Sequence, residues 1–537
     1  MKESITFSIL FPLYNMKAEY LYETIQLLTE QTYENWELCI VDASNQDHEY
    51  VKKICEYFCE RDERIKYKAL SSQEKTAQTY QKCLEMAAGE YIGLLNQNDL
   101  LHTDALRAYA EELKEKKAVG IYCDEDSFTE KLSDAHEPLY KPDYAPEFLT
   151  GYNYIGQFCV LNREIVLKAG GFDSTLAGSQ MYDLLFRVFE ISDDILHLPR
   201  VYYYRRKVEN ELEVEVQKTA EISRTDQVAI LNHIKRCGKQ GTVEQLEDEQ
   251  RMYRVKYLVE GTPLVSILIP NKDHVEELMD CIDSIREKST YQNYEIIIVE
   301  NGSTEPVTFA YYKKLEQEKA AGVLEWKGGF NYSAINNFAI HQAKGEYVLL
   351  LNNDIEVITP EWIEEMLMYV QQKEIGAAGA MLYYYDDTIQ HAGVILGIGG
   401  VAGHSHKYFQ RGARGYMGRL KVVQDLTAVT AACMLVKKSV LEQVGGFDEE
   451  MKVAFNDVDL CMKIREAGYR IVFTPFAELY HYESKSRGME DSPEKIRRFE
   501  GETGHFQKKW NRQLEAGDPF YNRNLTLVTE DFEISKV

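Results

Sequence analysis

The carboxylate best placed for chemistry in this chain comes shortly after an apolar run. Asp354 follows the apolar residues 347–351, with two asparagines between them. An Asp in such a place is commonly a turn residue or a helix cap, but the helix expected next has its own start signal in Thr359-Pro360. Since Asp354 is not needed as a cap, we interpret it as a ligand of a hard divalent cation, Mg²⁺ or Mn²⁺, that also binds a diphosphate.

Two further polar groups lie later in the same half of the chain. Asp457 and Asp459 stand two positions apart in NDVD, so they face different sides of the helix that we expect there. One can therefore point at a site while the other faces away or caps the helix, which disfavours two carboxylates sharing one proton. His481 follows the apolar run 471–473, and a histidine there, taken alone, is more often a structural residue.

These residues belong to one of two copies of the same pattern. Three blocks recur in the same order: residues 8–45, 89–91 and 170–173 match residues 266–303, 345–347 and 445–448. Blocks that recur in order at so long a spacing predict two homologous domains of about 260 residues each, and exclude a short-period solenoid.

Each copy contains three apolar runs separated by helical patterns. The runs are residues 9–11, 38–41 and 91–95 in the first copy and residues 265–269, 296–299 and 347–351 in the second. Near-continuous apolar runs that alternate with helices predict an α/β fold whose mostly parallel, Rossmann-like sheet is covered on both faces. Ligands bind at the carboxyl ends of such strands, and this is where Asp354 falls.

Composition excludes several classes of protein. The 537 residues carry 61 Lys+Arg against 87 Asp+Glu, a formal net charge of −26. Such a chain opposes nucleic-acid binding and docking on an anionic membrane through a basic surface. The ten cysteines form no CxxC pair, and we recognise no signal peptide and no transmembrane segment, so we expect a cytoplasmic protein with reduced thiols. Peripheral contact at the inner face of the cell membrane stays open.

Six motifs in the second half stand in the order of a known family. They are SILIP, VENGS, NND, GGFD, NDVD and HYESKSRG, between residues 266 and 488. In this order they resemble a family 2 glycosyltransferase of GT-A fold, of the bacterial tandem-domain kind that makes O-antigen, rhamnan and other cell-surface polysaccharides. The resemblance covers about residues 5–255 and 262–530. It implies two tandem GT-A domains, each with a nucleotide-diphospho-sugar transferase fold.

The resemblance also implies roles for single residues. Asp457 would be the catalytic base, and Asp354 the metal-binding Asp of a DXD-type motif whose first position is Asn352. His481 would be a further metal ligand, which replaces the structural interpretation above. With one anionic ligand, the site should bind its cation weakly before the nucleotide arrives. The positions implied for nucleotide binding are Pro270, Asn271, Glu300, Asn301, Asn352, Asn353, Lys485 and Arg487.

The first copy lacks the metal and base residues at the aligned positions. Asp354 corresponds to Asn98, Asp457 corresponds to Met181, and residues 202–206 hold no histidine. An amide is a poor replacement for a metal-binding carboxylate, and a thioether cannot accept a proton. The first copy is therefore expected to have lost the chemistry.

Two domains with different roles follow from this comparison. We expect residues 1–255 to be a degenerate GT-A-like domain, either a non-catalytic scaffold or an acceptor-glycan binder. Residues 256–537 are expected to be the catalytic domain with a C-terminal helix. The competing interpretation is a bifunctional enzyme whose first domain has a rearranged site. The carboxylates available for such a site are Asp99, Asp124, Glu125 and Asp126.

The predicted activity is metal-dependent, inverting transfer of a hexosyl or deoxyhexosyl group from a nucleoside diphosphate donor to a hydroxyl of a glycan or lipid-linked glycan. Kinship with rhamnan-type enzymes makes dTDP-rhamnose the first donor to test and a UDP-sugar the next. A non-enzymatic glycan-binding scaffold is the alternative from another class. A nucleotidyltransferase is disfavoured, because residues 271–274 are not the Gly-rich, basic loop that usually follows the first strand of such enzymes.

Two smaller features complete the second half. The histidines of GHSH, residues 403–406, are either a metal pair or part of a mobile loop on the acceptor side. We favour the loop, because no acidic residue or cysteine is near. The small residues 427–433, TAVTAAC, are expected to form a wall near the acceptor site.

Overall fold

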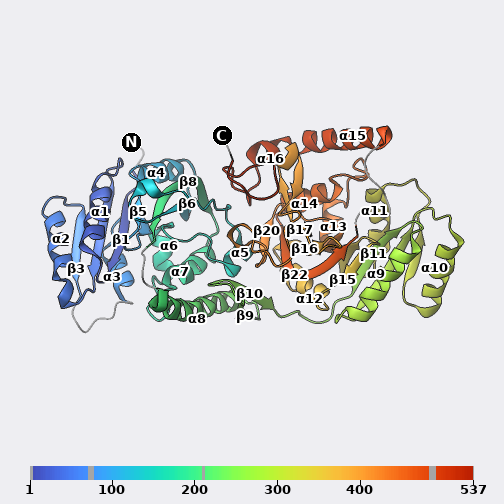
Figure 1. The fold of residues 1–537 in the computed structure, drawn as a ribbon, viewed down its shortest axis with the longest axis horizontal. Helices are drawn as coiled ribbons and strands as arrows, with labels where there is room; N and C mark the ends of the chain where they lie inside the picture. The colour runs from blue at the N-terminus through green and yellow to red at the C-terminus, as the bar shows by residue number, and fades with distance from the viewer. Residues whose placement is uncertain (1–3, 71–77, 208–211, 483–491, 536–537) are drawn as a thin grey trace. The chain divides into compact units, whose positions relative to one another are not determined.

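The chain folds into two units, each with its own sheet and core, as a computed structural model shows (Figure 1). The structure describes residues 4–70, 78–207, 212–482 and 492–535. The first unit comprises Met1–Tyr144 and Tyr152–Val255, and the second comprises Ala145–Gly151 and Lys256–Val537. A seven-residue segment of the first half of the chain is therefore part of the second unit.

The first unit is an eight-stranded sheet with helices between its strands. Its sheet strands are β1 (Phe7–Leu13), β2 (Trp36–Asp42), β3 (Ile65–Ala69), β4 (Tyr91–Leu94), β5 (Leu100–Leu101), β6 (Gly120–Phe128), β7 (Val160–Asn162) and β8 (Ile195–Arg206). Its helices are α1 (Ala18–Thr29), α2 (Glu49–Cys59), α3 (Thr79–Met86), α4 (Ala105–Glu115), α6 (Arg163–Lys168), α7 (Gln180–Phe189) and α8 (Leu212–Arg236). A hairpin of β9 (Gly241–Gln245) and β10 (Tyr253–Tyr257) spans the boundary between the units.

The second unit repeats this plan around a ten-stranded sheet. Its strands are β11 (Val265–Asn271), β12 (Tyr294–Glu300), β13 (Gly322–Glu325), β14 (Tyr347–Leu351), β15 (Ile355–Val357), β16 (Ile375–Tyr383), β17 (Ile389–His391), β20 (Gln424–Leu426), β21 (Cys433–Lys437) and β22 (Arg470–His481), beside a hairpin of β18 (Val394–Leu396) and β19 (Ala402–His404). Its helices are α5 (Pro146–Gly151), α9 (Val275–Lys288), α10 (Pro306–Glu318), α11 (Tyr332–Gln342), α12 (Trp362–Val370), α13 (Lys438–Val444), α14 (Asn456–Glu466), α15 (Pro493–Lys509) and α16 (Asn511–Ala516).

The two sheets have the same strand order. It is β3-β2-β1-β4-β7-β6-β8-β5 in the first unit and β13-β12-β11-β14-β21-β16-β22-β15 in the second, where β17 and β20 are added beside β16 and β22. This confirms the prediction that one α/β fold is used twice. The sheets are mixed: pairing is parallel from β3 to β4 and antiparallel where β7 joins β4 and β6. Apolar runs do not report strand direction, because a buried strand has much the same composition in either sense.

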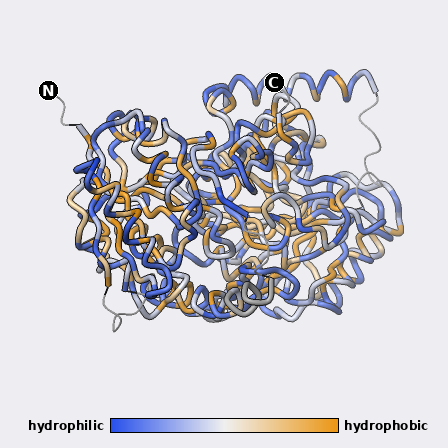
Figure 2. Tube along the Cα trace, turned by 60° about the vertical axis from the view of Figure 1, so that its left-hand side comes forward, coloured by the Kyte–Doolittle hydropathy of each residue, from blue (hydrophilic) through white to orange (hydrophobic). Residues whose placement is uncertain are grey.

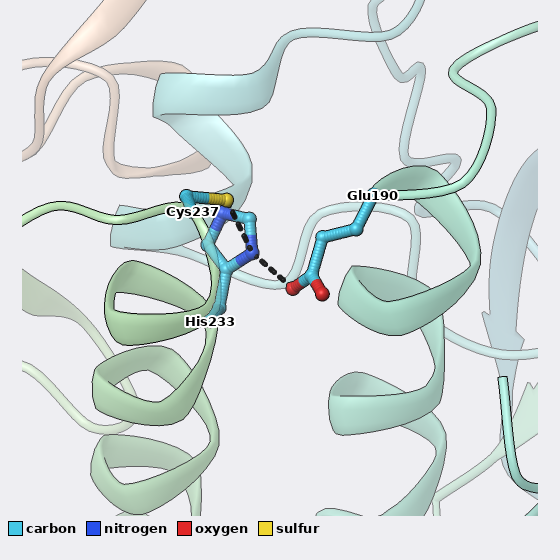
Figure 3. A group of neighbouring side chains, drawn as sticks. All are labelled: Glu190, His233 and Cys237. Carbon is cyan, nitrogen blue, oxygen red and sulfur yellow. Dashed lines mark hydrogen bonds and ion pairs between the residues drawn. The ribbon is translucent and has the colours of Figure 1, made fainter.

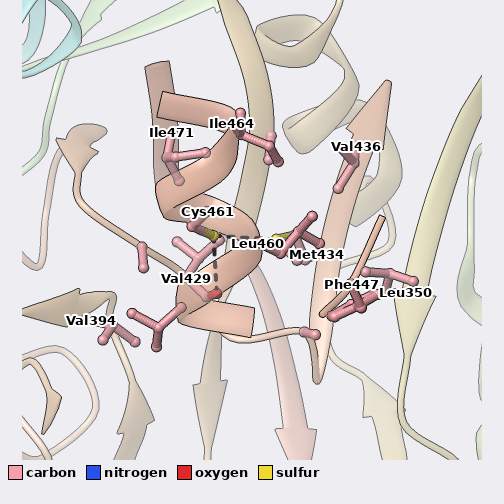
Figure 4. Packing of buried hydrophobic residues seen from close by; sticks show 14 of the residues in the cluster. Leu350, Val394, Val429, Met434, Val436, Phe447, Leu460, Cys461, Ile464 and Ile471 are labelled. Atoms are coloured by element: carbon pink, nitrogen blue, oxygen red, sulfur yellow. Dashed lines mark hydrogen bonds between the residues drawn. The ribbon is translucent and has the colours of Figure 1, made fainter. Parts of the chain in front are cut away.

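The helix that carries Asp457 is anchored in the core of the second unit. Leu460 and Cys461 of α14 are buried against strand residues such as Met434 (Figure 4). Cys461 Sγ lies 3.6 Å from the carbonyl oxygen of Val429 and 3.8 Å from Met434 Sδ. Because burying a large apolar side chain contributes about 1.5–3 kcal/mol, this packing fixes the start of α14 relative to the sheet.

Hydropathy along the chain follows the layering of each unit. Apolar residues gather in the interior, where the buried strands lie, and hydrophilic residues are frequent on the outer parts of the chain (Figure 2). The C-terminal helix α15 is largely hydrophilic and buries only Glu502 and Phe506. Among the residues that the structure describes, no helix has the length and apolar character needed to cross a membrane.

The segment Ala145–Gly151 joins the second unit through a buried ion cluster. Arg470, the first residue of β22, lies with Nη1 2.5 Å from Asp425 Oδ1 and with Nη2 3.1 Å from Glu147 Oε1. The backbone N–H of Glu147 also donates to Asp425 Oδ2 at 2.7 Å. Burial raises the pKa of Asp425 although Arg470 opposes that rise, so the cluster depends on each of its charges.

Glu147→Ala is expected to lower the free energy of unfolding of the second unit by about 1.5–3 kcal/mol, because it removes a buried hydrogen bond between charged groups, from Arg470 to Glu147. Urea denaturation of the whole chain measures this change in unfolding free energy. It is monitored with two spectroscopic probes so that the unfolding transitions of the two units can be separated. The matched control is Glu374→Ala: its carboxylate lies 3.7 Å from Arg470, but the side chain is 41% exposed, so we expect less than about 1 kcal/mol. Equal losses in the two variants would contradict the prediction.

Candidate active site

Strand register brings Asp354 and His481 together. Asp354 ends the loop after β14, and β15 then pairs antiparallel with the end of β22, with Ile355 opposite His481. The backbone N–H of Tyr482 donates to the Asp354 carbonyl oxygen at 3.0 Å. As a result, His481 Nε2 lies 3.2 Å from Asp354 Oδ1, and both residues are buried, at 7% and 5% exposure.

Two amides set the state of the His481 ring. Nδ1 donates to Gln390 Oε1 at 2.6 Å, so Nε2 carries the lone pair and accepts from Asn352 Nδ2 at 3.1 Å. A cation placed between Nε2 and Asp354 Oδ1 would be bound by the imidazole lone pair and by the carboxylate. A metal ion bound at about 2.1 Å to both atoms would subtend about 100° between them, near the octahedral angle. One carboxylate and one imidazole nitrogen at this spacing therefore fit a divalent cation.

Asp457 occupies the second position of α14 and is held by two backbone groups. Its Oδ2 accepts from the N–H of Ala431 at 3.1 Å, and its Oδ1 accepts from the N–H of Val458 at 2.9 Å. Asp459 serves the fold instead: it is fully buried and accepts from Trp510 Nε1 at 2.9 Å. The side chain of Asp457 is only half-buried, which leaves it available to a bound molecule.

A short stretch of small residues links Asp457 to the Asp354 loop. The carbonyl oxygen of Ala432 accepts from the backbone N–H of Asn352 at 3.1 Å. The backbone N–H of its neighbour Ala431 donates to the Asp457 carboxylate. The Tyr332 hydroxyl lies 3.3 Å from the Ala431 carbonyl oxygen and 3.4 Å from Asn352 Oδ1. These contacts place Asp457 and the Asp354 loop at the same edge of the sheet.

A second polar network lies at the ends of β11 and β12. Asn271 and Glu300 are opposite each other in the strand register. Asn271 Nδ2 donates to the Tyr312 hydroxyl at 2.8 Å, and that hydroxyl donates to Glu300 Oε2 at 2.7 Å. Glu300 Oε2 also accepts from the Ser303 hydroxyl at 2.6 Å. Asn353 Nδ2 donates to Asn271 Oδ1 at 2.6 Å, so this network continues into the Asp354 loop.

The remaining predicted nucleotide positions differ in what the structure shows. Asn301 is buried, and its N–H donates to the Asn271 carbonyl oxygen at 2.9 Å. Pro270 is half-buried and is paired with Val299. Lys485 and Arg487 lie outside the described residues. Sequence reasoning missed Gln390, Ser303 and Tyr312; of these only Ser303, inside the VENGS motif, carried a signal.

The GHSH segment differs from the mobile loop that we expected. Gly403 and His404 end strand β19, Ser405 and His406 lie in the turn that follows, and His406 is fully buried. Both ring nitrogens of His406 are engaged, Nδ1 with the Ser405 hydroxyl at 2.6 Å and Nε2 with the N–H of Tyr416 at 3.1 Å. Burial lowers its pKa to about 3. His404 instead contacts His391, with their Nδ1 atoms 2.9 Å apart, so this contact joins the end of β19 to the end of β17.

The first unit has different side chains at the equivalent positions. In its sheet Leu100 of β5 lies opposite Tyr204 of β8. The next residue along β8 is Arg205, which takes the position that His481 has on β22 of the second unit. Arg205 Nη1 lies 3.1 Å from Glu125 Oε1. Met181 is the second residue of α7, as Asp457 is of α14.

The carboxylates available for a rearranged site in the first unit all form hydrogen bonds or ion pairs with other residues of that unit. Asp99 accepts from the Tyr203 hydroxyl at 2.6 Å and from the N–H of Arg206 at 3.0 Å, and burial raises its pKa to about 6. The other three have the following partners. Asp124 contacts His197 at 2.9 Å, Glu125 contacts Lys141 at 2.9 Å, and Asp126 accepts from the N–H of Glu137 at 2.8 Å.

The sequence is similar to known proteins. The sequence matches the family model described as glycosyl transferase family 2 over residues 8–169 and 266–445. Over 98% of its length it is 39% identical to the uncharacterized protein y4gI of Sinorhizobium fredii and 32% identical to the O-antigen biosynthesis protein RfbC of Myxococcus xanthus. The chain spans 58% and 40% of the length of these two proteins.

A shorter stretch resembles an enzyme of defined activity. Over 60 residues the chain is 40% identical to the N-acetylglucosaminyl-diphospho-decaprenol L-rhamnosyltransferase of Mycobacterium tuberculosis. The match covers 11% of this chain and 20% of that enzyme.

Proposed function

Because the chain belongs to glycosyltransferase family 2, we propose that its second unit moves a sugar from a nucleoside diphosphate donor to a hydroxyl of a glycan acceptor in bacterial surface polysaccharide synthesis. The observation that carries the proposal is the buried pair of Asp354 and His481, 3.2 Å apart. Asp457 lies at the same sheet edge through its contact with Ala431. The name of RfbC, an O-antigen biosynthesis protein, supports this class of product.

Asp354 and His481 are the proposed ligands of Mg²⁺ or Mn²⁺. When bound, the cation acts as a Lewis acid that neutralises charge on the departing diphosphate. Gln390 and Asn352 hold the His481 ring with Nε2 directed toward Asp354. Since Asp354 is the one anionic ligand of the pair, donor phosphate oxygens are expected to complete the coordination.

Asp457 is the proposed catalytic base. Its carboxylate takes the proton of the acceptor hydroxyl while that oxygen attacks the anomeric carbon and the bond from this carbon to the diphosphate oxygen breaks. The N–H groups of Ala431 and Val458 orient the carboxylate before the acceptor arrives. A single displacement of this kind inverts the anomeric configuration.

The nucleotide is proposed to lie along the ends of β11 and β12. The network of Asn271, Tyr312 and Glu300 supports a rigid, polar pocket there. The proposed contacts are Pro270, Asn271, Glu300, Asn301, Asn352 and Asn353, with Lys485 and Arg487 proposed for the diphosphate. The likeness to an L-rhamnosyltransferase supports dTDP-rhamnose as the first donor to test, and a UDP-sugar as the next.

The first unit is proposed to be a non-catalytic scaffold or acceptor-glycan binder. The replacement of Asp457 by Met181 and the committed state of Asp99 support this role. The acceptor is proposed to be a growing or lipid-linked glycan, which would place the protein in the cytoplasm at the inner face of the cell membrane. A donor panel that measures nucleoside diphosphate release with and without Mn²⁺ tests the function. Release from one donor, dependent on Mn²⁺ and acceptor, is expected; metal-independent release would contradict it.

Gln390→Ala is expected to raise the Mn²⁺ concentration for half-maximal activity about 10–100-fold, because losing the partner that orients a ligating histidine weakens metal binding by this amount. Activity at saturating Mn²⁺ should change much less. Gln390→Glu keeps an acceptor for Nδ1 and should restore most of the metal affinity. An unchanged Mn²⁺ dependence in Gln390→Ala would show that the contact with His481 has no positioning role.

A further inference from the structure

Three side chains with metal-binding atoms meet at the ends of two helices of the first unit. Glu190 follows the last residue of α7, while His233 lies in the last turn of α8 and Cys237 follows that helix. Their ligand atoms all lie within 4.8 Å of one another. Figure 3 shows Glu190 facing His233 and Cys237 from the opposite helix. The proposed transfer reaction uses none of them.

Local structure explains why the three groups converge. His233 and Cys237 are four residues apart and therefore share one face of the helix. His233 Nδ1 lies 2.7 Å from Glu190 Oε1 and 3.7 Å from Cys237 Sγ. The His233 ring also stacks on Phe186 of α7, with the ring centroids 4.4 Å apart. The imidazole is thus fixed with one nitrogen directed at both neighbours.

The spacing suits a tetrahedral metal ion. In such a site, with a metal–sulfur bond of about 2.3 Å and a metal–nitrogen bond of about 2.1 Å, sulfur and nitrogen are about 3.6 Å apart. The observed separation of Cys237 Sγ and His233 Nδ1 is 3.7 Å. The Glu190 oxygen must withdraw by about 0.6 Å, since a metal-bound oxygen and nitrogen are about 3.3 Å apart. Cys237 is the one exposed thiol among the described cysteines, so an ion and a water ligand can reach the site.

Arg236 competes for Glu190 but does not close the site. Its Nε lies 2.7 Å from Glu190 Oε2, and its Nη2 lies 2.9 Å from Oε1. A metal on Oε1 leaves the contact of Arg236 with Oε2 in place. Asp183 Oδ1, 3.8 Å from Arg236 Nη1, offers the guanidinium a second carboxylate. The displaced hydrogen bond therefore has a replacement nearby.

Metal binding at this cluster would displace the protons on two ligand atoms. His233 Nδ1 would lose the proton that it shares with Glu190 Oε1, and Cys237 Sγ would lose its thiol proton, and both protons would go to solvent.

We propose that Glu190, His233 and Cys237 form a binding site for a borderline-soft divalent metal such as Zn²⁺, which ties the ends of α7 and α8 together. The thiolate and imidazole select for such an ion over Mg²⁺. The site is independent of the transferase reaction proposed for the second unit, whose two metal ligands include no thiol.

Titration of the full chain with Cd²⁺ tests the site, because a cadmium–thiolate bond gives an ultraviolet charge-transfer band. We expect saturation at one equivalent per chain. Cys237→Ser should abolish the band, and His233→Gln should weaken binding at least about tenfold. Cys59→Ser, at a partly buried thiol on α2, is the matched control and should keep the band. A band that survives in Cys237→Ser, or the lack of any saturable band in the unchanged chain, would overturn the proposal.

Discussion

Asp457→Asn is expected to reduce sugar transfer by about 10²–10⁴-fold, the range over which a positioned general base contributes to rate. The amide keeps the size of the side chain and an acceptor oxygen for the N–H of Ala431, so the fold should be retained. Single-turnover transfer from the preferred donor measures the effect, with donor affinity recorded separately. Because the substitution removes the base and leaves the nucleotide pocket intact, kcat should fall while donor binding persists.

The control for this substitution lies on the same helix. Glu466 is the last residue of α14 and is exposed, so Glu466→Gln makes the same chemical change far from the sheet edge and should leave kcat within about twofold. Appreciable residual transfer in Asp457→Asn would mean that a second site operates. In that case Asp99 and its neighbours in the first unit would have to be tested, despite the hydrogen bonds that now hold them.

Asp354→Asn is expected to abolish the Mn²⁺ dependence of donor binding and to lower transfer by at least about 100-fold, since a catalytic metal supplies several kcal/mol of charge stabilisation. The amide that replaces the one anionic ligand of the pair is a poor ligand for a hard cation. Calorimetric titration of the donor with and without Mn²⁺ separates the loss of metal from the loss of nucleotide binding.

Asp386→Asn provides the matched control for the metal site. Asp386 is exposed, and its Oδ1 accepts from the N–H of Thr388 at 3.0 Å, a bond that an Asn oxygen can keep. Its titration should be unchanged. If Asp354→Asn still bound the donor in a Mn²⁺-dependent way, the pair of Asp354 and His481 would not be the cation site, although the nucleotide pocket could still be correct.

The repeated blocks were sufficient to predict the architecture, because a strand that is buried in one copy is buried in the other. They also predicted that Asp354 follows a strand end, since an apolar run shows where a strand stops. Local sequence patterns could not predict which residue lies beside Asp354. His481 lies beside it through the pairing of β15 with β22, a contact across more than 100 residues that no local periodicity reports. The resemblance, and not the spacing, pointed to this histidine.

Residues that act through others were the hardest to predict. Gln390 carries no motif, and its role follows from a single contact with His481. The prediction for the GHSH segment was wrong in another way. Glycines around polar residues are typical of a mobile loop, but His406 is fully buried, so the segment is packed against the rest of the unit. The boundary between the units was also more complex than a cut in the sequence, because Ala145–Gly151 belongs with the later half.

That last feature has a consequence for biosynthesis. Glu147 precedes Arg470, its ion-pair partner, by 323 positions. At translation rates of about 5–20 residues per second, roughly 15–65 s pass between the synthesis of the two residues. During this interval Ala145–Gly151 has been synthesised, but Arg470, which it contacts in the folded protein, has not. If the gene were divided between residues 255 and 256, the later half would fold without the segment Ala145–Gly151, and Arg470 would keep Asp425 but lose its second buried carboxylate, Glu147.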